Sequence, residues 1–457
     1  MKPFSWEKGF PDVFKQGGFN IVIGNPPWGA EIDSNSLKYL KIKNSEIIVR
    51  MIDSFMYFIH KSYSILKTDG EFGMIVPDVL LYQIDNTKLR EFILKNTKIN
   101  STINLGDVFE KVVRPACILI FTKVKATSKN QILLLDISKI KREEKNKYLI
   151  EESSREIIMQ NEIYNLPNCV FVTANPKHYI ILDKIIKHST KKLSEFIDED
   201  GIQRGVSPDL KEAFLITTKQ AKESKLEKSH LRNALTGGKQ VKRYYINYPD
   251  LKLIYTKRED DFSTLPNICK FISQFKSKIT CKEVKENKHS LYSLHRSREE
   301  KIFLKSEKLI GVITEDEIKV AIDSKKTYAT DGLYLFGIKG IDIKYLMALL
   351  NSKLFVFVYR LISMESGRVL AQVKPTILNE LPIKYISHQD TKHKEIIKNV
   401  ENIIKLNDEL KESKVPTNTE QIKQRLEYSE EKINQLVYEL YNLTEKEIKI
   451  IEGGVHE

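Results

Sequence analysis

The sequence lacks several features that would assign it to a specialised class. No apolar run approaches the about 18 residues that span a bilayer, and no secretory signal is visible, so we expect a cytoplasmic protein without membrane contact. The four cysteines include no Cys-x-x-Cys pair, which excludes a disulfide scaffold and gives no metal or redox spacing. No two glycines are spaced Gly-x-Gly, so the chain offers no glycine-rich turn of the kind that cradles a cofactor.

The composition is that of a globular protein with a surplus of positive charge. Apolar residues make up 41% of the 457 residues and charged residues 30%, and this length suits two or three domains. The 74 basic and 61 acidic residues leave a net charge of +13, which favours a nucleic-acid partner if the charges gather on one face. A lysine-rich protein without such a partner is the alternative.

The first stretch, residues 1–135, alternates short apolar runs with helical periodicity. The order strand, helix, strand, helix, strand predicts an open, doubly wound α/β sheet. The apolar run 19–24 is expected to be a strand buried on both faces of that sheet. The other elements expected here are a helix over 47–66, a strand over 71–76 stopped by Pro77, a helix around 89–93, and strands over 99–105 and 116–124.

The rest of the chain changes its pattern twice. Two apolar stripes on either side of Pro416 predict an antiparallel helix hairpin. Thr444 and Glu447 have the spacing of a capping box, which predicts a last short helix. The regions expected are a connector over 136–190 with a helix near 179–186, an α+β region over 191–386 with one clear helix at 345–358, and a helical region over 387–457.

The sequence Asn25-Pro26-Pro27-Trp28, directly after the first predicted strand, is the most informative part of the chain. Open α/β sheets bind their ligands at the carboxyl ends of strands, where this sequence falls. The Asn25 amide oxygen and the Pro26 carbonyl can each accept one N–H of a nucleobase amine, which aims its lone pair at an incoming methyl group. Pro27 stiffens the loop, and Trp28 offers a flat face to a base flipped out of a duplex. The alternative to a base-binding site is a structural proline turn whose tryptophan packs into the protein interior.

These residues and their surroundings resemble the amino-group DNA methyltransferases, and within them the gamma-class N6-adenine enzymes of type IIG restriction-modification systems. The approach from Phe10 to Gly24 looks like that family's lead-in to its catalytic motif, with Trp28 replacing the commoner tyrosine or phenylalanine. The segment Leu105–Phe109 is similar to a later family motif, whose aromatic residue packs against the flipped adenine. The resemblance implies that role for Phe109, which is otherwise an ordinary core residue.

The likeness continues beyond the predicted sheet, to the TaqI-like specificity domain that follows the catalytic domain in these enzymes. The segments that carry it are 201–208, 231–244, 345–352 and 376–383. The resemblance therefore implies a Rossmann-like methyltransferase sheet, an α+β DNA-specificity domain and a helical hairpin. Basic and aromatic side chains there can hold phosphates and reach base edges, although each could be a solvated loop residue. The candidate DNA contacts are Arg204, Lys239, Lys242, Arg243, Tyr244, Arg296 and Arg298.

The resemblance also implies S-adenosyl-L-methionine as the methyl donor, but the chain lacks the main binding motif for it. In the gamma class the glycine-rich cofactor loop precedes the catalytic sequence, and only 24 residues precede Asn25 here. We therefore expect the C-terminal half of the sheet, in which the strand at 19–24 is an open edge that a separate chain covers. A truncated gene product is the alternative.

The sequence thus predicts a component of a site-specific adenine-N6 methyltransferase that acts on double-stranded DNA. Residues 25–28 are the expected catalytic residues, and Trp28 and Phe109 hold the base. Two other classes stay open: a DNA-recognition subunit without catalysis, and a methyltransferase of RNA or protein amines. A Pro-Asp…Glu-x-Lys nuclease site formed by Asp250, Glu283 and Lys285 is a further alternative.

Overall fold

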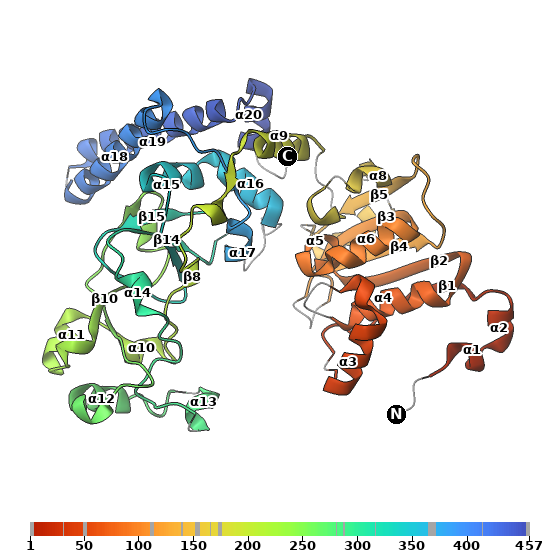
Figure 1. Ribbon diagram of the computed structural model, residues 1–457, viewed down its shortest axis with the longest axis horizontal. Helices are drawn as coiled ribbons and strands as arrows, with labels where there is room; N and C mark the ends of the chain where they lie inside the picture. The colour runs from red at the N-terminus through yellow and green to blue at the C-terminus, as the bar shows by residue number, and fades with distance from the viewer. Residues whose placement is uncertain are drawn as a thin grey trace. The chain divides into compact units, whose positions relative to one another are not determined.

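The structure, a computed structural model, divides into two compact units, residues 1–175 and 176–457, which we describe one at a time (Figure 1). The boundary falls within the stretch expected to be a connector. The residues described are 4–30, 32–48, 53–109, 114–138, 140–150, 156–164, 166–171, 176–279, 281–286, 288–315, 317–363, 372–413 and 415–453.

The first unit is built on a mixed sheet with the strand order β1-β2-β4-β3-β5-β6. β1 is parallel to β2 and β3 is parallel to β5, whereas β4 runs antiparallel to both of its neighbours. The strands are β1 (Phe19–Gly24), β2 (Leu66–Pro77), β3 (Lys98–Gly106), β4 (Ala116–Thr122), β5 (Gln131–Asp136) and β6 (Glu156–Met159). The α/β class and the predicted strands are confirmed, and β2 begins five residues before its predicted start at 71.

Helices α4, α5 and α6 lie across one face of this sheet (Figure 1). Ile59 of α4 and Ile93 of α6 pack with the sheet residues Phe72 and Phe121, whose rings stack with centroids 4.3 Å apart. The helices of this unit are α1 (Trp6–Gly9), α2 (Pro11–Lys15), α3 (Ser34–Lys43), α4 (Ser54–Ile65), α5 (Val79–Tyr82), α6 (Thr87–Asn96), α7 (Lys145–Ile150) and α8 (Gln160–Ile163).

Two predictions for this unit need correction. The helix expected over 47–66 begins only at Ser54, after a 3-10 turn at Ser45–Ile47, and residues 49–52 lie outside the described part. The strand at 19–24 is not buried on both faces, because Ile21 is 62% exposed and Ile23 is 83% exposed. β1 is the end strand of the described sheet, so the predicted open edge is confirmed.

The second unit contains two four-stranded sheets, β15-β14-β17-β8 and β16-β10-β13-β9. One apolar cluster runs through both sheets and the helices around them, from Val206 to Leu335. The strands are β7 (Lys191–Lys192), β8 (Gln203–Arg204), β9 (Leu215–Ile216), β10 (Leu231–Leu235), β11 (Val241–Lys242), β12 (Tyr245–Ile246), β13 (Lys252–Ile254), β14 (Lys308–Val312), β15 (Val320–Asp323), β16 (Tyr328–Ala329), β17 (Leu333–Phe336) and β18 (Pro382–Ile383).

The helical hairpin and the last helix of this unit are confirmed as predicted. α18 packs along α19, and the capping box forms, because the Thr444 backbone N–H donates to Glu447 at 2.7 Å. The helices are α9 (Pro176–His188), α10 (Lys211–Phe214), α11 (Thr218–Glu223), α12 (Pro266–Ser273), α13 (Lys282–Lys285), α14 (Glu300–Phe303), α15 (Ile343–Asn351), α16 (Lys353–Ser363), α17 (Pro375–Leu378), α18 (Thr391–Glu412), α19 (Pro416–Leu440) and α20 (Glu445–Gly453).

The single helix expected at 345–358 is instead two helices, α15 and α16, bent by 65°. The break falls at Ser352, whose hydroxyl accepts from the Phe355 N–H at 3.3 Å and so caps the start of α16. Among the described residues no single helix is long and apolar enough to cross a membrane, and this bent pair passes that test only when its two halves are taken together.

Candidate functional site

The carboxyl ends of β1 and β3 bring the Asn-Pro-Pro-Trp sequence and Phe109 to the same edge of the first unit's sheet. The Trp28 indole meets the Phe109 ring edge to face, with centroids 5.5 Å apart and planes at 70°. Both rings are half-buried and pack against the same apolar cluster around Leu105. The two residues expected to hold a base therefore lie side by side.

The two acceptors that the sequence singled out are free. Asn25 is exposed, and in the described part of the chain neither its side-chain amide nor the Pro26 carbonyl has a hydrogen-bond partner. The Nε1–H of Trp28 is buried and also lacks a partner among the described residues. An arrangement of two free acceptors beside a half-buried indole can receive a planar group that carries two N–H bonds.

The loop that carries these acceptors is fixed from the start of α4. The Ser54 hydroxyl donates to the Pro27 carbonyl at 2.6 Å, and Asp53 accepts from the Gly29 backbone N–H at 2.7 Å. Gly29 has φ +64°, a left-handed backbone conformation that favours glycine. Asp53 and Ser54 were not predicted from the sequence, because no sequence motif connects the start of a helix to a loop about 25 residues earlier.

Lys145 holds the turn that carries Phe109. Its buried ammonium donates to the Leu105 carbonyl and, at 3.2 Å, to the Asp107 carbonyl. Burial lowers the pKa of Lys145 from its ordinary value. Arg142 donates to the Phe109 carbonyl at 3.2 Å. Both positioning residues come from the stretch expected to be a connector, where no motif marked them.

The described residues do not form a cofactor site. β1 is the end strand of the described sheet, and no glycine-rich strand-to-helix turn lies beside the Asn25 loop in that part of the chain. The described residues around Asn25 therefore include no glycine-rich turn that could cradle S-adenosyl-L-methionine.

In the second unit the structure gathers three of the predicted DNA contacts, Arg204, Arg296 and Arg298, into what we call the arginine cluster. Arg204 and Arg296 are exposed. Burial lowers the pKa of Arg298, and the charges of Arg296 and Arg204 lower it further. The backbone of Arg296 pairs with Ser207, and Arg298 donates to the Gly205 carbonyl at 3.2 Å. Three cations held this close favour an anion such as phosphate.

The other four predicted contacts separate into two pairs. Lys239 and Lys242 are exposed. Tyr244 is only 4% exposed, and burial raises its pKa well above the ordinary value. It has φ +65° in the turn between β11 and β12. Its burial therefore gives no support to the prediction that Tyr244 reaches base edges.

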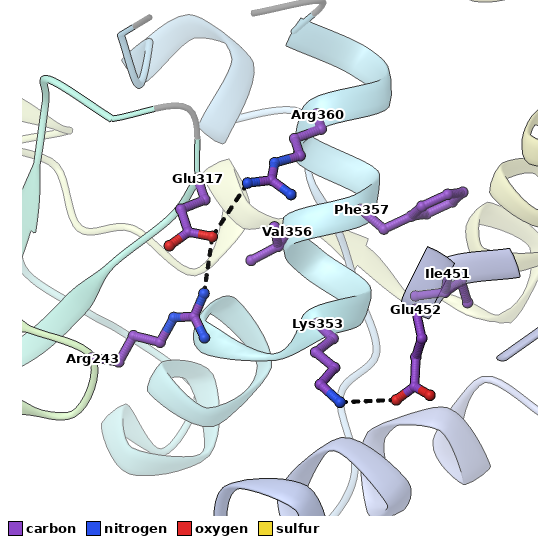
Figure 2. Close-up of a pocket in the computed structure, with 8 residues that line it drawn as sticks. All are labelled: Arg243, Glu317, Lys353, Val356, Phe357, Arg360, Ile451 and Glu452. Atoms are coloured by element: carbon purple, nitrogen blue, oxygen red, sulfur yellow. Dashed lines mark hydrogen bonds and ion pairs between the residues drawn. The ribbon is translucent and has the colours of Figure 1, made fainter. Parts of the chain in front are cut away.

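Arg243 also faces inward, into a cavity of about 230 Å³ beside α16 (Figure 2). Its guanidinium lies 3.0 Å from the Glu317 carboxylate, and Arg360 lies 3.4 Å from the same carboxylate. Figure 2 shows the two arginines approaching Glu317 from opposite sides. Arg243 thus ties the β11–β12 turn to α16, which is a structural role.

The nuclease alternative finds no support. Asp250 accepts from the Thr218 hydroxyl, and Glu283 lies 3.0 Å from Arg258. Within the part of the chain that the structure describes, no group of potential metal ligands includes Asp250 or Glu283.

Comparisons with known proteins show which families the chain resembles. Residues 1–109 match the Eco57I restriction-modification methylase family, and residues 233–383 match the TaqI-like C-terminal specificity domain. A Methanocaldococcus jannaschii protein named as a type II restriction enzyme and methyltransferase is 27% identical over 364 residues, 79% of this chain and 26% of that protein. The Escherichia coli type II restriction enzyme and methyltransferase RM.Eco57I is 24% identical over 429 residues, 83% of this chain and 41% of that protein.

A solved structure supports the fold over the whole chain. The type IIL restriction-modification enzyme MmeI, in complex with DNA, superimposes with a TM-score of 0.60 over 98% of this chain and 58% of that chain, at 13% identity. The chain is thus related to the restriction-modification methyltransferases. More specifically, it joins an Eco57I-like methylase segment to a TaqI-like specificity domain, and it spans less than half the length of the two curated relatives.

Proposed function

We propose that this chain is the base-binding and DNA-recognition component of a site-specific DNA adenine-N6 methyltransferase in a restriction-modification system. The observation that carries the proposal is the pair of unpartnered acceptors at Asn25 and Pro26 beside the half-buried rings of Trp28 and Phe109. The similarity to type II restriction enzymes and methyltransferases supports the same class. The choice of adenine rests on the resemblance of the motif.

The chemistry of the site follows from its acceptors. The Asn25 amide oxygen and the Pro26 carbonyl each accept one N–H of the adenine amine, which draws its lone pair out of the ring and toward the methyl donor. The amine lies on the pairing edge, so the base must first leave the duplex. Trp28 and Phe109 then hold it, and stacking of this kind contributes about 1–3 kcal/mol per base.

In this proposal, the strands that pair with β1 also bring the binding site for the methyl donor. S-adenosyl-L-methionine supplies an electrophilic methyl group, and the described residues contribute no site for it. β1 presents an unpaired edge with Ile21 and Ile23 exposed. Such an edge is an aggregation hazard unless another strand pairs with it. We infer that strands of a separate chain complete the sheet here and bring the cofactor site.

Sequence recognition falls to the second unit. The arginine cluster and the exposed Lys239 and Lys242 suit contacts to phosphates, which position the protein on the duplex but do not read sequence. Base reading is assigned to other side chains of the specificity domain, which extends over residues 233–383.

The decisive experiment is the Asn25→Ala variant, assembled with the separate chain that we propose to complete the sheet. Loss of one of two acceptors should lower single-turnover methylation about 100- to 1,000-fold and leave DNA affinity unchanged. Asn399→Ala is the matched control, because among the described residues the Asn399 amide bonds only to the Glu395 carbonyl of its own helix, α18. Methylation at the unaltered rate in Asn25→Ala would refute the assignment.

A DNA-recognition subunit without catalysis is the second candidate. The observation that favours it is the lack of a cofactor site among the described residues. The same assay separates the two functions, since a recognition subunit binds specific DNA tightly but transfers no labelled methyl group with any partner chain.

A further inference from the structure

Four side chains of the second unit, each a potential metal ligand, converge on one point away from the site described above. They are Asp209, Cys281, His289 and His295, and their donor atoms all lie within 4.8 Å of one another. The side chains of Asp209 and His289 are 1% and 0% exposed. Three of the four come from the segment that includes α13, and Asp209 comes from the loop after β8.

The spacing of these donors matches a tetrahedral metal site. The Cys281 Sγ lies 3.9 Å from the His289 Nε2 and 3.7 Å from the His295 Nδ1. The Asp209 carboxylate oxygens lie 3.7 Å from the His289 Nε2 and 3.2 Å from the His295 Nδ1. Zinc bonds of about 2.0 Å to nitrogen or oxygen and about 2.3 Å to sulfur place tetrahedral ligands about 3.3–3.6 Å apart.

Hydrogen bonds satisfy only part of this cluster, in which the His295 Nδ1 lies 3.2 Å from the Asp209 Oδ1. The His289 Nδ1 lies 3.0 Å from the Ser290 carbonyl, which can only accept, so Nδ1 carries the proton and Nε2 turns its lone pair to the cluster. The Asp209 Oδ2 is buried without a hydrogen-bond partner among the described residues. Two buried acceptors that face each other are unfavourable, and a cation between them removes the conflict. A ring N–H that donates to a carbonyl is also the usual support of a metal-bound histidine.

We propose that Asp209, Cys281, His289 and His295 bind a zinc ion. A thiolate and two imidazoles suit zinc, whereas magnesium and calcium prefer sites built of oxygen ligands alone. Binding replaces the proton of the Cys281 thiol, which passes to water. Four protein ligands leave no open position on the metal, so the ion is structural: it joins the Asp209 loop to the segment that ends at His295.

This zinc site has a consequence for the arginine cluster. Arg296 follows His295 directly, and its backbone N–H and carbonyl bond to Ser207, two residues before Asp209, at 3.1 and 3.0 Å. The metal therefore closes the loop that presents Arg296. The effect on DNA binding rests on the proposed function. Zinc binding itself does not, because it is tested without DNA.

The test begins with the full chain purified without chelators, whose zinc is measured by plasma mass spectrometry. We expect one zinc per chain, and a fall of at least about tenfold in Cys281→Ser and in His289→Ala. Cys269→Ser is the matched control, because Cys269 is another half-buried free cysteine of the same unit, with its Sγ 3.5 Å from the Phe262 carbonyl. Cys269→Ser should keep its zinc.

Two measurements on the unaltered sequence keep the proposal testable if a variant misfolds. Cobalt added to the metal-free chain should give a thiolate-to-metal charge-transfer band in the near ultraviolet, and zinc should abolish it. Zinc should also slow alkylation of Cys281 by iodoacetamide and leave that of Cys269 unchanged, as read by peptide mass spectrometry. A chain without zinc that gives no cobalt band, or a Cys281→Ser variant with full zinc content, would overturn the proposal.

Discussion

The Ser54 hydroxyl donates to the Pro27 carbonyl at 2.6 Å, while the preceding carbonyl, that of Pro26, accepts no hydrogen bond from the described residues. One carbonyl of the loop is thus fixed by the protein and its neighbour is left for a ligand. Because proline has no N–H, neither Pro26 nor Pro27 can donate to the free oxygen. The start of α4 therefore orients the acceptors, although it contributes none itself.

Ser54→Ala should lower methylation without unfolding the first unit. The loop loses its anchor at Pro27, and a displacement of about 1 Å in a positioning group can cost about 100-fold in rate. The measurement is single-turnover methylation by the completed enzyme. Ser64→Ala is the control on the same helix, because the Ser64 hydroxyl donates to the Lys61 carbonyl one turn away and to no other residue that the structure describes. Equal rates for the two variants would show that Ser54 does not position the loop.

Arg296→Ala should weaken DNA binding equally for all sequences. Each phosphate contact that is lost reduces the slope of log affinity against log salt by about 0.9. Fluorescence anisotropy at several salt concentrations measures that slope. Arg425→Ala is the control, since this exposed arginine of α19 lies 3.7 Å from Glu409 and belongs to no cluster of arginines that we describe. An unchanged slope in Arg296→Ala would remove the arginine cluster from the DNA interface.

The site residues that could be predicted from the sequence all lie in short local motifs. The Asn-Pro-Pro-Trp sequence could be read directly, and its place at the end of a strand follows from the order of the elements. Arg90 shows that contacts between residues far apart in the sequence cannot be predicted in this way. It lies in a predicted helix but is fully buried, and it donates to the carbonyls of Leu80 and Asn168, at 2.9 and 2.8 Å. No pattern indicates a bond between residues 78 positions apart.

The same limit applies to the candidate DNA contacts of the second unit. Lys242 and Arg243 are adjacent basic residues, yet one is exposed and the other pairs with Glu317 across the fold. Cys281 has no neighbouring cysteine in the sequence, and only the folded chain brings it to His289 and His295. Charge and spacing predict the chemistry of a segment, whereas tertiary contacts decide which side chains are free to use it.

Ile23→Lys should prevent assembly with the chain that we propose to complete the sheet. Ile23 is 83% exposed on the edge strand β1, so the substitution should leave the free chain folded, but a lysine on an edge strand opposes pairing. The measurement is the yield of complex after co-expression, which should fall at least about tenfold. Ile157→Lys is the matched control, since Ile157 is 60% exposed on β6 at the opposite edge. An unaltered chain that methylates DNA alone would contradict the need for a partner.

The buried ion pair of Lys308 and Asp323 predicts the acid sensitivity of the second unit. The ammonium lies 2.5 Å from the carboxylate, and both side chains are 0% exposed. Burial by itself raises the pKa of Asp323, but the charge of Lys308 and the bonds from Thr327 outweigh it and hold that pKa below the ordinary value. The Asp323 carboxylate therefore adds stability above its unfolded pKa of about 3.9, and this stability is lost as the pH falls through the lower folded pKa.

Lys308→Met should thus lower the free energy of unfolding of the second unit by about 3–5 kcal/mol at neutral pH, because the Asp323 charge is left buried and unpaired. The loss of stability caused by Lys308→Met should shrink as the pH falls, since burial without the cation raises the pKa of Asp323 and protonation removes the unpaired buried charge. Both tryptophans, Trp6 and Trp28, lie in the first unit, so hydrogen exchange of the β14 amides must report the change. Asp183→Asn is the control, as its carboxylate on α9 is exposed and, within the described part of the chain, pairs only with Lys187. A loss of stability in Lys308→Met that stays the same from neutral to acid pH would show that the pair does not set the pH dependence.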